Sequence, residues 1–127
     1  MRLRRRKNKY KVSKLEKEIL ALLISNDYEV VPQFIIPNIP YIFDFYFPKL
    51  NTILEVQGTY WHCDPNQYKP GSLIKMAGLG NVLVDYIWAK DRLKKEMAER
   101  QGFKLITLWE DDYKKSGWEA IAKCLLQ

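Results

Sequence analysis

The sequence predicts an α/β fold in which a mixed central β-sheet is flanked by helices. The segments follow one another in the order helix, hairpin, helix, strand and helix, and the strand segments are short and mostly apolar. The chain has 127 residues and 47% of them are hydrophobic, which suits one domain with one core. We therefore expect a basic N-terminal arm over residues 1–12 and a single domain over residues 13–127.

The first helix is predicted from Ser13 to about Asn26. The stretch "SKLE" forms a capping box with Ser13 at the N-cap and Glu16 at the third helical position. Helical spacing of apolar side chains supports this helix at Leu15, Ile19, Leu22 and Leu23. The segment after the helix, "YEVVPQFIIP", is typical of extended chain interrupted by prolines.

A hairpin is predicted next, with strands over residues 41–47 and 52–57 joined by the turn "PKLN". The polar, proline- and glycine-containing stretch "HCDPNQYKPGS" then indicates a loop. A second helix is expected from roughly Val82 to Arg100, ended by Gly102 at the C′ position. The apolar run "FKLITLW" predicts a further strand, and residues after Lys115 predict a last helix.

The charge pattern indicates a polyanionic partner. The formal net charge is +6, and Lys and Arg gather over residues 2–11 and 90–95, as in proteins that bind nucleic acid. A solubilising tail and a solvated helix face explain the same clusters and stay open as alternatives. The chain has no apolar run long enough to cross a membrane, no secretory signal, and two distant cysteines without a zinc-binding pattern. We expect a cytoplasmic protein with reduced thiols and no membrane partner.

Two acidic residues lie where a buried strand is predicted. Asp44 and Glu55 each stand among apolar neighbours, and a hairpin that turns near residues 48–51 places them across from each other. Two facing carboxylates repel, and burial raises the cost, unless a cation lies between them. Mg²⁺ prefers such oxygen ligands together with phosphate and water. The alternative is that one of the two acids points to solvent from an edge strand.

Three further polar residues are candidates for the same site. Glu16 falls within the apolar arc of the first helix, although the capping box also explains it. Asp91 falls within the apolar arc of the second helix, where an ion pair with Lys94 or Lys95 is the alternative. His62, the only histidine, follows the hairpin and could transfer a proton, although a lone histidine is more often structural.

These motifs resemble the very short patch repair (Vsr-like) endonucleases of the PD-(D/E)XK nuclease superfamily. The resemblance spans about Leu15 to Glu110 and is carried by "LEKEILALL", "FDFYFPKLNTILEVQGTYWH" and "AKDRLKKEMAERQGFKLITLWE". It implies a restriction-endonuclease-like core and a Mg²⁺-dependent DNA endonuclease, with Mn²⁺ as a substitute. A role in DNA repair and one as a phage or mobile-element homing nuclease stay open, as do monomer and homodimer. The alternatives are an inactive nucleic-acid-binding module on the same fold and a small basic structural protein.

The resemblance also implies roles for individual residues. Asp44, Glu55 and the main-chain carbonyl of Val56 would bind the metal, and His62 would be the catalytic histidine. Glu16 and Asp91 would be accessory acids on the flanking helices. The resemblance implies that Tyr60 and Trp61 wedge between bases, with packing in the core as the alternative. The charge pattern adds the predicted DNA contacts Arg4, Arg5, Arg6, Lys7, Lys90 and Arg92.

The sequence departs from the family pattern at two places. Gln57 stands where the superfamily has a lysine, so we count it among the catalytic candidates as an orienting group and assign proton transfer to His62. The positions of the repair enzyme's structural zinc ligands hold Thr59, Asp64 and Asn66. No structural zinc is therefore expected, and mismatch specificity does not follow from the resemblance.

Overall fold

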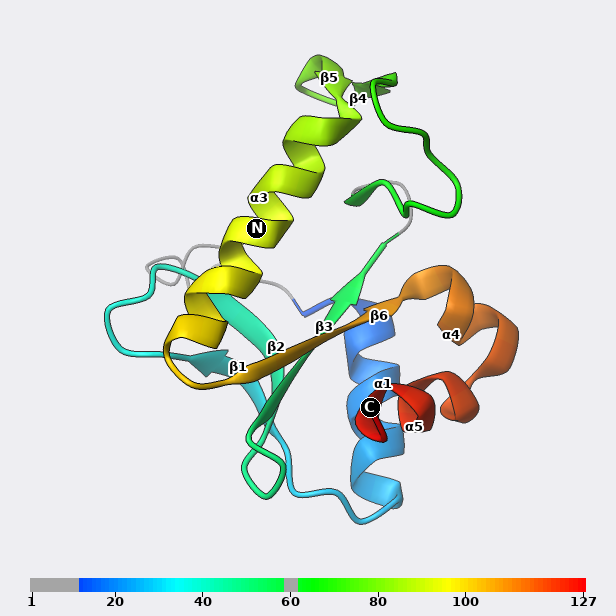
Figure 1. The fold of residues 1–127 in the computed structure, drawn as a ribbon. Helices are drawn as coiled ribbons and strands as arrows, with labels where there is room; N and C mark the ends of the chain where they lie inside the picture. Colours follow the sequence, from blue (N-terminus) through cyan, green and yellow to red (C-terminus); the bar gives the residue numbers. More distant parts are fainter. Residues whose placement is uncertain (1–11, 59–61) are drawn as a thin grey trace.

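The computed structural model describes residues 12–58 and 62–127 (Figure 1). The predicted basic arm, apart from its last residue, and the aromatic pair Tyr60 and Trp61 lie outside these ranges. The elements are α1 (Lys14–Ser25), β1 (Val31–Ile35), β2 (Ile42–Phe47), β3 (Thr52–Gln57), β4 (Leu73–Met76), β5 (Gly80–Leu83), α3 (Val84–Arg100), β6 (Lys104–Trp109), α4 (Glu110–Ser116) and α5 (Trp118–Leu125).

The central sheet is mixed, as predicted. Its strand order is β1-β2-β3-β6, with antiparallel pairing from β1 to β3 and parallel pairing between β3 and β6. Strand β1 contains Pro32, which the sheet tolerates because β1 is an edge strand. The parallel pair brings Glu55 beside Thr107, so β6 supports the strand that carries the second acid.

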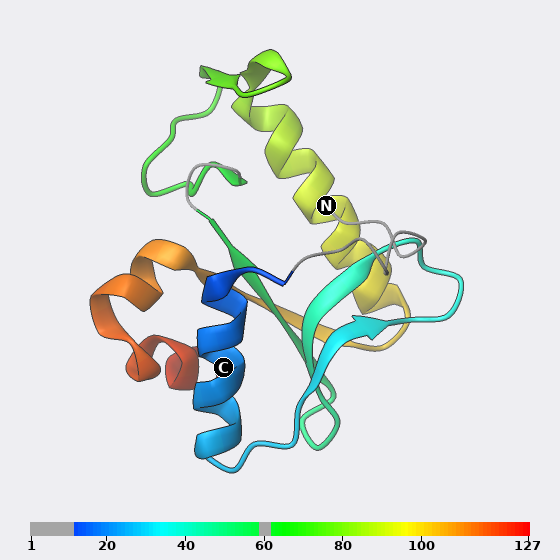
Figure 2. The same cartoon turned by 180° about the vertical axis from the view of Figure 1, so that it is seen from behind.

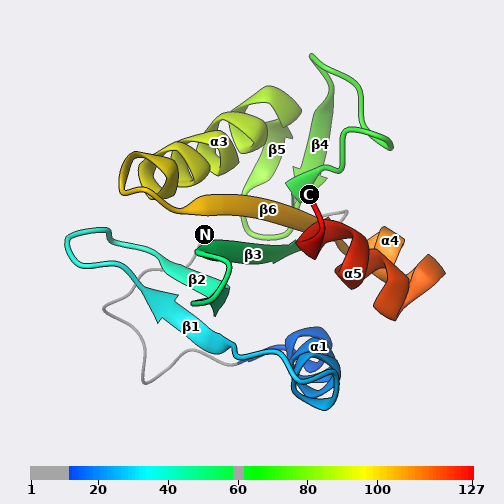
Figure 3. The ribbon, with the colours of Figure 1, turned by 60° about the horizontal axis from the view of Figure 1, so that its bottom comes forward.

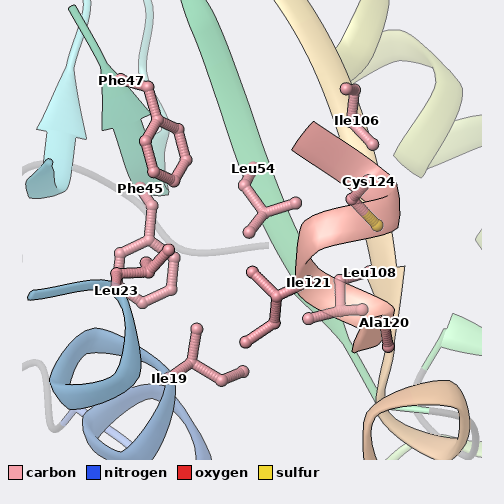
Figure 4. Close-up of a cluster of buried hydrophobic side chains, with 10 residues drawn as sticks. All are labelled: Ile19, Leu23, Phe45, Phe47, Leu54, Ile106, Leu108, Ala120, Ile121 and Cys124. Atoms are coloured by element: carbon pink, nitrogen blue, oxygen red, sulfur yellow. The ribbon is translucent and has the colours of Figure 1, made fainter. Parts of the chain in front are cut away.

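Helices cover both faces of this sheet (Figure 3). On one face α1 and α5 pack against β2, β3 and β6, and Figure 4 shows the side chains that meet there. On the other face Ala98 of α3 packs with Ile53 and Leu105. The larger core comprises Ile19, Leu23, Phe45, Phe47, Leu54, Ile106, Leu108, Ala120, Ile121 and Cys124.

Truncating Ile121 tests this core. Ile121 is fully buried in α5, so we expect Ile121→Ala to lower the free energy of unfolding by about 2–5 kcal/mol. Leu126, at the end of the same helix, is 84% exposed, and Leu126→Ala serves as the matched control with little effect. Urea unfolding of both variants measures the difference. Equal midpoints for the two variants would contradict the packing of α5 on the sheet.

The structure corrects the predicted elements after the first hairpin. A second hairpin, β4–β5, lies at the end of α3 away from the four-stranded sheet (Figures 1 and 2) and was not predicted. Gly78 in its turn and Gly80 at the start of β5 both have positive φ. The second helix begins at Val84 and not at Val82, because Val82 pairs with Ile74 in this hairpin.

The C-terminal helical region also differs from the prediction. Helix α4 begins at Glu110, directly after β6, whereas a helix was expected only after Lys115. Three acids in its first turn, at residues 110–112, favour a helix start there. Gly117, with φ 57, separates α4 from α5. The predicted end of the second helix is confirmed, since α3 ends at Arg100 and Gly102, with φ 93, lies at its C′ position.

Within the described ranges no helix is both long and apolar enough to cross a bilayer.

Candidate active site

One cavity of about 470 Å³ collects every residue predicted to be catalytic. Its walls come from α1, β2, β3, the segment after β3, and α3, so it depends on the tertiary fold and not on one motif. Val56 of β3, the residue whose carbonyl was predicted to bind the metal, lines the cavity as well. The predicted residues that line it are Glu16, Asp44, Glu55, Gln57, His62 and Asp91.

Asp44 and Glu55 lie across from each other on neighbouring strands, as predicted. The antiparallel register pairs Phe45 with Leu54, and one further step along it places the two acids opposite. Their exposed fractions are 2% and 4%, and the N–H of Val56 donates to Asp44 Oδ2 at 2.8 Å. Neither acid therefore points to solvent from an edge strand.

The environment of Asp44 favours its protonated form. Burial is the largest cause that raises the pKa of this carboxyl well above its usual value, followed by the negative charge of Glu55 and a hydrogen bond with it. The ammonium of Lys94 and the N–H of Val56 act in the opposite direction. The acidic pair is thus stabilised when positive charge is supplied to it.

The site contains a buried lysine that was not predicted to belong to it. Lys94 Nζ lies 2.7 Å from Glu55 Oε1 and donates to the main-chain carbonyl of Ile42 at 3.2 Å. The side chain is only 7% exposed, and its ammonium lies 4.9 Å from the centre of the Phe43 ring. The sequence did indicate that Lys94 faces inward, because its spacing places it on the same helical face as Ile87, Asp91 and Ala98.

His62 and Asp91 form a hydrogen-bonded pair. His62 Nδ1 lies 2.9 Å from Asp91 Oδ2, and both side chains are mostly buried. Asp91 thus pairs with the histidine, and Lys94, one of the two lysines considered as alternative partners, pairs with Glu55 instead. A carboxylate at one ring nitrogen fixes the tautomer and orients the ring.

The chain around His62 is held by α3. The main-chain N–H of His62 donates to the carbonyl of Gly58 at 3.1 Å. Cys63, the next residue, is fully buried and has a positive φ of 52°, which turns the chain sharply after the histidine. Trp88 Nε1 donates to the Cys63 carbonyl at 2.6 Å, so the helix that supplies Asp91 also anchors this segment.

Glu16 takes part in the N-cap of α1. Its N–H donates to the Ser13 hydroxyl at 3.1 Å, which is the N-cap bond of the predicted capping box, and that hydroxyl donates to Glu16 Oε1 at 3.3 Å. The same glutamate lines the cavity. An acid at the first turn of α1 can therefore stabilise the helix and face the site.

The predicted DNA contacts are only partly described. Lys90 lines the cavity, and its ammonium lies 5.2 Å from the centre of the Tyr86 ring. Arg92 is exposed and lines a smaller adjoining hollow of about 150 Å³ that shares Glu55 and Asp91 with the cavity. The remaining predicted contacts, Tyr60, Trp61, Arg4, Arg5, Arg6 and Lys7, lie outside the described residues.

The donor set fits Mg²⁺ in its chemistry. The carboxylates of Asp44 and Glu55 and the carbonyl of Val56 are hard oxygen donors, and Mg²⁺ commonly takes one or two carboxylates and completes its shell with water and phosphate. Within residues 12–58 and 62–127, no group of three or more His, Cys, Asp or Glu side chains is arranged to hold a metal ion. A metal at this position would therefore need main-chain, water or substrate oxygens as well.

No family model matches the chain, and no curated protein matches it. The cavity and the residues that line it are therefore the features that bear on function.

Proposed function

We propose that this protein is a Mg²⁺-dependent DNA endonuclease with a PD-(D/E)XK core, similar to the very short patch repair endonucleases. The observation that carries the proposal is the convergence of six polar residues, chosen from the sequence alone, in one cavity. They come from elements far apart in the chain, and a small basic structural protein would have no need to bring them together. The proposed cellular setting is the cytoplasm, on DNA, in repair or in homing.

Five of the six polar residues have a task in phosphodiester hydrolysis. Asp44, Glu55 and the Val56 carbonyl would hold Mg²⁺ or Mn²⁺, which when bound polarises the scissile phosphate and lowers the pKa of water. With the Nδ1–H of His62 donating a hydrogen bond to the Asp91 carboxylate at 2.9 Å, the Nε2 lone pair would be left to accept a proton. Gln57, at the cavity wall, would orient water or phosphate.

Positive charge around the cavity suits a DNA substrate. Lys90 lines the cavity and Arg92 the hollow beside it, so both can neutralise phosphates that flank the scissile bond. The formal net charge of +6 adds a long-range attraction for a polyanion. Binding of this kind weakens as the salt concentration rises.

An inactive nucleic-acid-binding module is the second candidate. The ion pair between Lys94 and Glu55 supplies one positive charge to the acidic pair without a metal. Glutamine at position 57 cannot supply the charge of a lysine there. On this reading the basic residues bind nucleic acid and the acids serve only the fold.

Cleavage in the presence and absence of metal separates the two candidates. We expect the wild-type protein to nick or linearise supercoiled, mismatched or branched DNA in Mg²⁺ or Mn²⁺ and to leave it intact in EDTA. Asp44→Asn protein, purified in parallel, controls for contaminating nucleases. DNA binding without cleavage under every metal condition would support the inactive module and contradict the nuclease.

A further inference from the structure

Lys94 is the most unusual charged residue of α3. Its neighbours Arg92 and Lys95 are exposed, as expected for basic residues on a helix, whereas Lys94 is 7% exposed. Burial of an ammonium group is costly unless the charge is paired and hydrogen-bonded. The negative charge of the site must therefore balance the ammonium of Lys94, and the ammonium in turn balances part of that negative charge.

The ammonium lies between the two strands that carry the acids. It contacts Glu55 of β3 at 2.7 Å and the carbonyl of Ile42 in β2 at 3.2 Å, two residues before Asp44. Its positive charge also acts on Asp44, whose pKa it lowers against the effect of burial. A single monovalent cation thus occupies the place where the acidic pair needs positive charge.

We propose that Lys94 is the resident cation of the acidic pair, which a divalent ion must displace from Glu55 in order to bind. The biological use of this exchange rests on the proposed nuclease function, whereas the competition for Glu55 rests on the geometry alone. Lys94 is therefore a positioning residue that sets the metal affinity of the site.

The net charge of the site indicates which ligand favours the replacement of Lys94 by a divalent ion. Two ionised carboxylates are neutralised by one divalent cation, so the displaced ammonium becomes an excess positive charge beside a low-dielectric site. An anion that enters the cavity restores the balance, and a phosphodiester carries the single negative charge required. Metal and DNA are then bound more favourably together than separately, which is a coupling between two ligands of one site.

Replacement of Lys94 by a neutral side chain of similar length tests the competition. We expect Lys94→Met to bind Mn²⁺ at least about tenfold more tightly than the wild type in calorimetric titration without DNA, because a like charge has been removed from the site. Lys123→Met makes the same charge change at an exposed position of α5, outside the cavity and the adjoining hollow, and should bind Mn²⁺ as the wild type does. Equal Mn²⁺ affinities of Lys94→Met and Lys123→Met would overturn the inference.

A measurement on the wild type covers the case in which Lys94→Met does not fold. The side-chain ¹⁵N resonance of Lys94, assigned by its absence from Lys94→Arg protein, should shift when diamagnetic Mg²⁺ is added, and that of Lys123 on α5 should not. A Lys94 signal unchanged at saturating Mg²⁺ would overturn the inference.

The inference and the nuclease proposal fail in different ways. If Lys94→Met binds Mn²⁺ more tightly while the wild type cleaves no DNA, the nuclease proposal is wrong and the role of Lys94 stands. If the wild type cleaves DNA while both lysine variants bind Mn²⁺ alike, only the role of Lys94 is wrong.

Discussion

Asp44→Asn should abolish metal-dependent cleavage and at the same time stabilise the fold at neutral pH. Asparagine keeps the shape of the side chain and an oxygen that can accept from the Val56 N–H, but it removes the charge that would bind the metal. We expect a loss of at least about a hundredfold in the cleavage rate, since the metal supplies several kcal/mol of transition-state stabilisation. Plasmid nicking in Mg²⁺ measures the loss, and gel-shift assays in EDTA should show that DNA binding is retained.

The stability change follows from the raised pKa of Asp44. Because the folded protein holds this proton more tightly than the unfolded chain does, the contribution to stability is fully present below the ordinary pKa of 3.8. It is lost as the pH rises through the higher pKa of the folded state. Asp44→Asn has no such loss, so its melting temperature should exceed that of the wild type at neutral pH and approach it as the pH falls toward 3.8.

A buried aspartate outside the cavity provides the control for this variant. Asp64 is 2% exposed and accepts from the N–H of Asn66 at 3.0 Å, and it does not line the cavity. Asp64→Asn should cleave DNA at the wild-type rate. A wild-type rate for Asp44→Asn would contradict the assignment of the metal site.

His62→Ala should reduce cleavage by about 10²–10⁴-fold, the range expected when a general acid or base is removed. Asp91→Asn should also reduce cleavage, because it disturbs the orientation of the ring that the 2.9 Å bond provides. The double variant should be little slower than His62→Ala, since two residues that act as a unit are not additive. Single-turnover cleavage assays at saturating protein measure all three rates.

Two further observations would separate catalysis by His62 from a structural role. Added imidazole should restore part of the activity of His62→Ala and none of that of Asp44→Asn. Asp85→Asn is the matched control for Asp91→Asn, because Asp85 lies on the same helix and contacts the N–H of Gly71, away from the cavity. Full activity of His62→Ala would show that the histidine does not transfer the proton.

Local chemistry made the first half of the fold predictable. The strand over Thr52–Gln57 and the helix start at Ser13 were predicted with their observed bounds, because a four-residue turn and a capping box depend only on neighbours in the chain. The opposition of Asp44 and Glu55 follows from the same turn, which fixes the register of the hairpin.

The missed features depend on long-range packing or on weak local signals. The strands of β4–β5 have four residues each and are mostly exposed, so they show little of the apolar alternation that marks a strand. Helix α4 has no side-chain cap at its start. The pairing of Lys94 with Glu55 required knowledge of how α3 lies on the sheet, and the helix alone indicated only that Lys94 faces inward.

The spacing of residues on α3 has a mechanical consequence. Trp88, Asp91 and Lys94 follow at intervals of three residues along one helix, and each contacts a different partner in the cavity region. The β4–β5 hairpin continues directly into the first residue of this helix. A displacement of the hairpin that tilts α3 would therefore strain the histidine pair and the lysine pair together, so the geometry of the two pairs is mechanically linked through one helix.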